Sequence, residues 1–297
     1  PLLCAVAGVV GTGGWWGAWR EWTGGEVVWS RPGVGGKVRW RLRRCGEEWT
    51  YHRARTRATV KVTLLSAQQA AAYYDPEKSK GAYPTRDEYL ADIVDISRRE
   101  VAELVRLGCT YLQVDAPQYA ALLDPAMREG YRKRGSDPEE VIDRCIEMDN
   151  AIIAGHPEVT FGLHICRGNN QSKFYAEGDY EPISRIFQKT HFQRFLLEYD
   201  DGRSGGFEPL RHVPEDRTVV LGLVTTKKGR LEDAAELRDR TARASRYVPL
   251  ARPPLTPQPR PAHALCLHRL PPSRYPAPLL PAFAPPPSLV GSEHRPC

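Results

Sequence analysis

The chain has 297 residues, of which 41% are hydrophobic and 26% are charged, an ordinary composition for a globular protein. This balance excludes a collagen-like chain and a chain that is disordered throughout. The net charge of +6 lies at the two ends, because acidic residues slightly outnumber basic ones between residues 60 and 250, so the sequence predicts no nucleic-acid partner.

Membrane insertion and disulfide bonding are not expected either. The longest apolar run, residues 1–10, is much shorter than a membrane-spanning helix, which needs about 20 apolar residues. No basic segment precedes this run, as a secretory signal would require. The seven cysteines are scattered and odd in number, which does not indicate a disulfide framework. We therefore expect a cytoplasmic protein without a membrane partner.

The composition divides the chain into three segments. Residues 1–59 are an atypical segment that contains all seven tryptophans and shows no strand-like or helix-like period. Residues 251–297 are rich in proline, which cannot donate ladder or helix hydrogen bonds, and are predicted to be a disordered tail. Residues 60–250 have an ordinary composition and clear periodicity, and are predicted to form the folded domain. The two ends read either as low-complexity extensions or as the product of a shifted reading frame.

Helices and short strands alternate along the middle segment. Residues 85–88 (Thr-Arg-Asp-Glu) form a capping box, and the apolar residues that follow lie on one helical face. Residues 111–115 are predicted to be a strand. A second helix begins at residues 137–140 (Asp-Pro-Glu-Glu), and residues 160–166 form the next strand.

The same alternation continues to residue 246. We expect a short helix at 182–189, strands at 194–200 and 218–226, and a long helix at 231–246. Repeated strand–helix–strand units predict parallel pairing, with helices covering the sheet. No glycine-rich phosphate turn follows any strand, so we prefer an α/β fold of the (β/α)8 TIM barrel type, incomplete at both ends, over a doubly wound open sheet.

Polar residues lie where four of these strands end, which is where a barrel gathers its active site. They are Asp115, His164 with Cys166, Glu198 with Asp200, and Lys227. Residues two apart on a strand point to the same side, so His164 and Cys166 could bind one metal ion, and both are zinc ligand types. Glu198 could supply a third ligand. The alternative is that the histidine and the cysteine are buried structural residues and that Glu198 belongs to a solvated acidic loop.

The motifs around these residues resemble the cobalamin-independent methionine synthase family, and above all its shorter single-barrel relatives. The matching segments are His-Ile-Cys-Arg-Gly-Asn at 164–169, Phe-Leu-Leu-Glu-Tyr-Asp-Asp at 195–201, Tyr-Leu-Gln-Val-Asp-Ala-Pro at 111–117, Arg-Ser-Gly-Gly-Phe-Glu-Pro-Leu at 203–210 and Val-Val-Leu-Gly-Leu-Val-Thr-Thr-Lys at 219–227. The resemblance covers roughly residues 36–258, and these motifs follow the order in which the family has them.

The resemblance implies a (β/α)8 catalytic domain with a zinc ion held by a second cysteine and by His164, Cys166 and Glu198. It also implies that Asp115 contacts the amino group of the thiol substrate, homocysteine. The expected reaction is zinc-dependent transfer of a methyl group from a 5-methyltetrahydrofolate-type donor to this thiol, in methionine biosynthesis. Zinc suits the task because it replaces the proton of a substrate thiol at neutral pH.

The sequence departs from the family pattern at two places. Pro259 stands where the family has its last cysteine ligand, and residues 222–227 stand where the synthases have a histidine that serves proton transfer. We therefore expect impaired activity. Two alternatives are alkylation of another thiol, such as coenzyme M, and a barrel remnant without catalysis.

Four further polar residues lie close to these motifs. Arg167 and Asn169 are interpreted as residues that orient the metal loop. Arg203 and Lys227 either bind a carboxylate of a substrate or are solvated charges.

Overall fold

The computed structural model describes residues 6–20, 26–40, 44–169, 173–225, 227 and 231–248. The segment predicted to be a tail, which includes Pro259, lies outside these residues. None of the described helices is long and apolar enough to cross a membrane.

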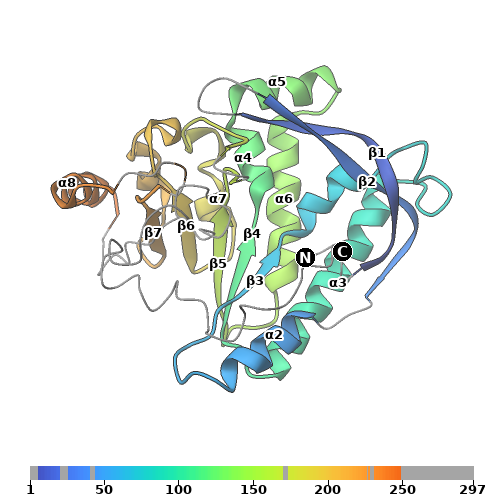
Figure 1. Cartoon of the computed structure of the whole chain (residues 1–297), viewed down its shortest axis with the longest axis horizontal. Helices are drawn as coiled ribbons and strands as arrows, with labels where there is room; N and C mark the ends of the chain where they lie inside the picture. Colours follow the sequence, from blue (N-terminus) through green and yellow to red (C-terminus); the bar gives the residue numbers. More distant parts are fainter. Residues whose placement is uncertain are drawn as a thin grey trace, which may run out of the picture.

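Five parallel strands form the centre of the fold (Figure 1). They are neighbours in chain order and comprise β3 Val62–Leu65, β4 Tyr111–Asp115, β5 Thr160–Ile165, β6 Arg194–Glu198 and β7 Thr218–Gly222. A doubly wound sheet reverses its strand order at a switch point, whereas a barrel keeps its strands in chain order. The α/β class with a parallel sheet is therefore confirmed. Among the described residues β3 and β7 are outer strands, so this part of the chain does not close into a barrel.

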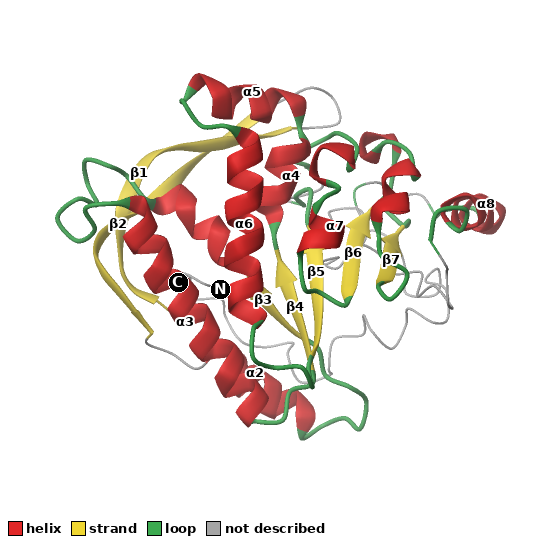
Figure 2. Ribbon diagram, turned by 180° about the vertical axis from the view of Figure 1, so that it is seen from behind, coloured by secondary structure: helices red, strands yellow, loops and turns green. Residues whose placement is uncertain are grey.

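Helices cover the sheet and fill the connections between its strands. They are α2 Arg44–Arg53, α3 Arg86–Arg106, α4 Pro117–Leu123, α5 Pro125–Lys133, α6 Pro138–Ile153, α7 Ile186–Lys189 and α8 Ala234–Ala244. Short 3-10 turns lie at η1 Ala67–Tyr73, η2 Glu181–Ile183, η3 Gly202–Ser204 and η4 Glu208–His212. Helices α3 and α6 contact each other and lie on one face of the strands, as Figure 2 shows.

The predicted helix starts are confirmed by their caps. The Thr85 hydroxyl accepts the N–H of Glu88 at 3.2 Å, and the Asp137 carboxylate accepts the N–H of Glu139 at 3.0 Å. The predicted strand at 218–226 is too long, because β7 ends at Gly222. Its partner β6 ends at Glu198 and offers no further ladder positions.

The segment at 1–59 contains regular elements that the sequence did not predict. Strands β1 Val6–Arg20 and β2 Glu26–Trp40 pair in an antiparallel ribbon. Several register shifts interrupt this pairing, and each one breaks the alternation by which a strand is recognised in a sequence. The end of β2 joins the core of the main sheet, because Val34 is fully buried and the main-chain N–H of Val38 donates to the Tyr83 hydroxyl at 2.8 Å.

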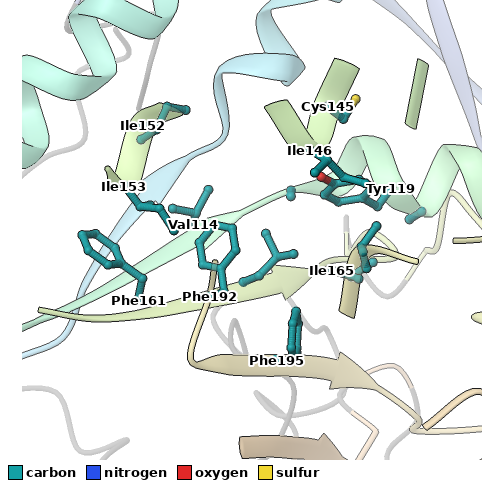
Figure 3. Packing of buried hydrophobic residues seen from close by; sticks show 14 of the residues in the cluster. Val114, Tyr119, Cys145, Ile146, Ile152, Ile153, Phe161, Ile165, Phe192 and Phe195 are labelled. Carbon is teal, nitrogen blue, oxygen red and sulfur yellow. The ribbon is translucent and has the colours of Figure 1, made fainter. Parts of the chain in front are cut away.

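Helix α6 packs its apolar side on the sheet (Figure 3). Ile152 and Ile153 lie near the end of this helix, beside Val114 of β4 and Phe161 of β5. All four side chains are at most 5% exposed. Burial of a large apolar side chain contributes roughly 1.5–3 kcal/mol to stability, so this contact holds the helix on the two central strands.

A buried carboxyl group joins α6 to the segment after β3. Asp149 is fully buried and accepts hydrogen bonds from the Ser66 hydroxyl at 2.5 Å and the Gln68 amide at 2.7 Å. Burial raises the pKa of Asp149 to about 6, although the hydrogen bonds oppose this shift. The main-chain N–H of Ser66 also donates to the carbonyl oxygen of Asp115 at 2.8 Å, so this cluster supports the end of β4.

We expect part of the stability of the protein to be lost as the pH rises through about 6. The pKa of Asp149 in the folded state exceeds its ordinary value of 3.8, so the folded protein binds this proton more tightly than the unfolded chain does. The resulting stabilisation is complete below pH 3.8 and disappears above pH 6. Asp149→Asn cannot ionise and should remove this dependence, which is on the order of 2–3 kcal/mol.

Urea denaturation at a series of pH values measures this slope. Asp95→Asn is the matched control, because Asp95 is an exposed carboxylate paired with Arg99, and it should keep the wild-type slope. Equal slopes for the wild type and Asp149→Asn would contradict the role given to Asp149.

Candidate functional site at the strand ends

Three neighbouring strands bring their last polar side chains together. In the parallel register Asp115 of β4 pairs with His164 of β5, and the next strand, β6, ends at Glu198. The three residues are between 2% and 5% exposed. Burial of Glu198 excludes the reading in which it lies in a solvated acidic loop.

His164 lies between two carboxylates. Its Nδ1 atom is 3.0 Å from Oδ1 of Asp115, and its Nε2 atom is 3.6 Å from Oε1 of Glu198, beyond hydrogen-bond distance. Nε2 is buried without a hydrogen-bond partner. Burial by itself lowers the pKa of this imidazole, but the two carboxylates outweigh burial and raise the pKa to about 9. The metal-free protein therefore holds His164 as a cation near neutral pH.

Asp115 is oriented by a residue of its own strand. The Gln113 amide donates to Oδ1 of Asp115 at 2.6 Å, and Nζ of Lys61 donates to Oε1 of Gln113 at 2.6 Å. Gln113 is 1% exposed. The sequence carried no signal for this role, because a glutamine in a strand is not specific to any chemistry until its neighbours are known.

Cys166 directly follows β5. Its sulfur accepts the main-chain N–H of Gly168 at 3.4 Å. Gly168 has a φ of 89°, a conformation that glycine adopts without a steric penalty, so the chain can turn back over the thiol. Burial raises the pKa of the Cys166 thiol to about 12, and the carboxylates of Glu198 and Asp115 act in the same direction. Without a metal this side chain is a thiol.

Glu198 is fixed through its side chain and its main chain. Its Oε2 atom accepts the main-chain N–H of Arg167 at 3.3 Å. The Tyr180 hydroxyl accepts the N–H of Glu198 at 3.0 Å and donates to its carbonyl oxygen at 3.1 Å. The Ser204 hydroxyl donates to the same carbonyl at 2.8 Å. Tyr180 and Ser204 carry no sequence signal for this role, because both act through contacts between distant segments.

The donor set fits a zinc ion, but the ligands are not gathered as a finished metal centre. An imidazole nitrogen without a hydrogen bond, a thiol and a carboxylate lie at one end of the sheet, and each is a zinc ligand type. A metal-binding histidine commonly donates its other ring N–H to a carboxylate, as Nδ1 of His164 can to Asp115. Within the described parts of the chain, no three His, Cys, Asp or Glu side chains stand close enough to hold a metal ion.

A second group of charges lies at the ends of β6 and β7. Nζ of Lys227 is 3.3 Å from Oδ2 of Asp200, and the guanidinium of Arg203 is 3.1 Å from Oδ1 of the same carboxylate. The Thr225 hydroxyl donates to Oδ2 of Asp200 at 3.0 Å. Lys227 and Asp200 are each 3% exposed. Arg203 and Lys227 are therefore buried ion-paired side chains and not solvated charges.

No family model matches the chain, but relatives are found by sequence and by structure. The uncharacterized protein YxjH of Bacillus subtilis is 33% identical over 216 residues, which are 72% of this chain and 57% of YxjH. The methionine synthase of Pyrococcus horikoshii is 23% identical over 193 residues, which are 65% of this chain and 48% of the synthase.

One similar solved structure is a B12-independent methionine synthase from Shewanella sp. W3-18-1 in complex with selenomethionine. It superposes with a TM-score of 0.62 at 19% identity, over 83% of this chain and 67% of that one. The likeness in structure shows a shared fold, and the archaeal synthase is related to the chain in sequence as well. The chain resembles the cobalamin-independent methionine synthases in sequence and in fold.

These similarities confirm the resemblance that the motifs indicate. The chain spans about half the length of the curated relatives that it matches. The activity and the substrates of a whole methionine synthase are for that reason proposals for this chain, and so are the roles of single residues.

Gly178, in the segment between β5 and η2, should not tolerate a side chain. Its φ of 132° is one that other residues rarely adopt, and a Cβ atom there would lie 2.8 Å from the carbonyl oxygen of Leu123. We expect Gly178→Ala to lower the free energy of unfolding by about 1–3 kcal/mol in urea denaturation. Gly81→Ala, where a Cβ meets open space, is the control and should change stability by less than about 0.5 kcal/mol. Equal losses in the two variants would speak against this reading of the loop.

Proposed function

We propose that this chain is a zinc-dependent methyltransferase that transfers a methyl group from a 5-methyltetrahydrofolate-type donor to the thiol of homocysteine. The environment of His164 carries this proposal. Asp115 holds its Nδ1 atom, and its buried Nε2 atom has no hydrogen-bond partner and faces Glu198. An imidazole fixed at Nδ1 by one carboxylate, with Nε2 directed at a second carboxylate, supports a metal-ligand role.

His164, Cys166 and Glu198 are the proposed zinc ligands. Zinc bound there would replace the proton of the substrate thiol and keep the sulfur nucleophilic near neutral pH. The chain itself supplies the orientation of these ligands. Gln113 and Asp115 hold the imidazole, and the main-chain N–H of Arg167 holds the carboxylate of Glu198.

Asp115 is also the proposed anchor for the amino group of homocysteine, as the family resemblance implies. A carboxylate pairs well with an ammonium group, and this one lies at the end of β4 beside the proposed ligands. The Shewanella synthase was solved with selenomethionine, which supports an amino-acid acceptor here. The thiol gives up its proton, and the bond from sulfur to the methyl carbon forms while the bond from this carbon to the donor nitrogen breaks. The nitrogen keeps the electron pair and takes up a proton.

The extent of the catalytic domain is part of the same proposal. The five consecutive parallel strands are proposed to belong to a (β/α)8 barrel formed by residues 60–250, between an atypical segment at 1–59 and a tail at 251–297. Pro259 leaves the site with one thiolate in place of two. Thiolates are strong zinc donors, so we expect weakened zinc binding and slow methyl transfer. A cytoplasmic location and the lack of nucleic-acid and membrane partners stay predictions.

The two alternatives receive less support. The relatives that are named for an activity are methionine synthases, which favours homocysteine over coenzyme M. The contacts of His164 with two carboxylates favour a working metal site over an inert barrel remnant.

Zinc binding is the first test of the proposal. We expect the purified chain to bind zinc, and His164→Ala and Cys166→Ala to weaken binding by more than about 100-fold, because each variant removes one of three ligands. Competition with a chromophoric chelator measures the affinity. His156→Ala is the matched control, since His156 lies outside the site and pairs with Glu158. Unchanged affinity in His164→Ala would refute the ligand assignment.

Methyl transfer is the second test. With a labelled 5-methyltetrahydrofolate donor and homocysteine we expect slow formation of methionine that a zinc chelator abolishes. Coenzyme M offered in parallel should stay unmethylated, and its preferential alkylation would replace the proposed acceptor.

A further inference from the structure

We propose that Arg167 is the positioning residue of this site. Its guanidinium connects the segment after β5 to the segment after β6 through hydrogen bonds, so that Cys166 and Glu198 stay at the same end of the sheet. The inference rests on the proposed metal role of these two residues, and it adds to them a residue that holds both without binding the metal.

Arg167 is completely buried, with an exposed fraction of 0%. A buried guanidinium is costly unless hydrogen bonds and nearby negative charge compensate the water that it loses. The carboxylate of Glu198 is near enough to contribute this compensation, and the Arg167 guanidinium carbon lies 4.5 Å from the centre of the Tyr180 ring. An arginine enclosed in this way serves contacts inside the protein and not a contact with solvent.

The guanidinium reaches two loops and a tyrosine at the same time. Nη1 donates to the carbonyl oxygen of Gly178 at 2.6 Å and approaches the carbonyl oxygen of Arg203 at 3.4 Å. Nε lies 3.5 Å from the Tyr180 hydroxyl, which is itself bonded to the main chain of Glu198 in both directions. The side chain therefore joins the segment around residue 178 to the turn around residue 203 and to the end of β6.

The main chain of Arg167 makes contacts of the same kind. Its N–H donates to Oε2 of Glu198 at 3.3 Å, and its carbonyl oxygen accepts the N–H groups of Tyr175 at 2.9 Å and Ala176 at 3.4 Å. The two loops are also bonded directly, because the N–H of Gly178 donates to the carbonyl oxygen of Arg203 at 2.9 Å. Arg167, which directly follows Cys166, thus connects the segment after β5 to both loops.

Only arginine combines the donors that this position uses. Its planar fork presents donors in several directions at fixed angles, whereas a lysine ammonium is a single point on a flexible stem. A methionine would fill much of the same space without donating at all. If Arg167 served packing alone, Arg167→Met would leave the loops in place.

Hydrogen exchange of the metal-free full-length chain tests the inference without relying on a bound metal. We expect the amides of Tyr175, Ala176 and Gly178 to exchange at least about 10-fold faster in Arg167→Met than in the wild type, and to be intermediate in Arg167→Lys. Arg128→Met is the matched control. Arg128 is a part-buried arginine on α5 that donates to the carbonyl oxygen of Leu122 at 2.8 Å and pairs with Glu139, and its loss should leave these three amides unchanged.

Cobalt titration of the same variants measures the consequence for the ligands. We expect Arg167→Met to weaken Co²⁺ binding about 10- to 100-fold and to reduce the thiolate-to-cobalt absorption band, with partial recovery in Arg167→Lys and no change in Arg128→Met. Weaker binding with an unchanged band shape and unchanged exchange would indicate a general loss of stability and would overturn the positioning role.

The proposed function and the role of Arg167 can be refuted separately. A wild-type chain that binds no cobalt contradicts the proposed function, and the exchange measurement still decides the role of Arg167. Wild-type exchange rates at the three amides in Arg167→Met overturn the positioning role, whatever the metal does. If Arg167→Met does not fold, Arg167→Lys carries the test, and wild-type exchange in this variant counts against the proposal.

Discussion

The contact between Asp115 and His164 is the interaction on which the rest of the site depends. The two residues are register partners on β4 and β5, so the ladder of a parallel sheet, and not a loop, sets their distance. A slip of one residue would turn one of these side chains to the opposite face of the sheet. The sheet therefore fixes the position of the imidazole, and Cys166 and Glu198 lie beside it.

Several ionisable groups are buried at one edge of the sheet, where unbalanced charge is costly. Neighbouring side chains balance most of this charge. Two carboxylates beside one imidazole leave an excess of negative charge, and they hold a proton on His164 when no metal is present. The same excess favours a divalent cation at this place. Farther along the edge, Asp200 is balanced by Lys227 and Arg203, so this carboxylate does not add to the negative charge beside His164.

Short sequence patterns predicted many of the helices, strands and strand-end residues. The elements and residues that they did not predict depend on contacts between distant parts of the chain. The caps at Thr85 and Asp137 and the strand at 111–115 are properties of short stretches, so the sequence was sufficient for them. The placement of Asp115, His164 and Glu198 followed from strand ends in a parallel sheet. Strands β1 and β2 were missed because register shifts break their alternation. Gln113, Tyr180 and Asp149 act through partners that no local pattern reveals.

The strands of the sheet position one part of the candidate site, and loops position the other part. This difference matters for whether the three proposed ligands alone could bind a metal ion. Asp115 and His164 need no ordering, because the strands hold them. Cys166 and Glu198 lie where the chain leaves its strands, and ordering such segments costs free energy that ligand bonds must offset. The proposed metal site, with Pro259 in place of a second cysteine, would have fewer ligand bonds to offset that cost. Ordering of residues 166–169 and 173–180 in the metal-free protein would then matter more than in a site with four ligands. The fully buried Arg167, bonded to Gly178 and to the N–H groups of Tyr175 and Ala176, is the residue in a position to provide it.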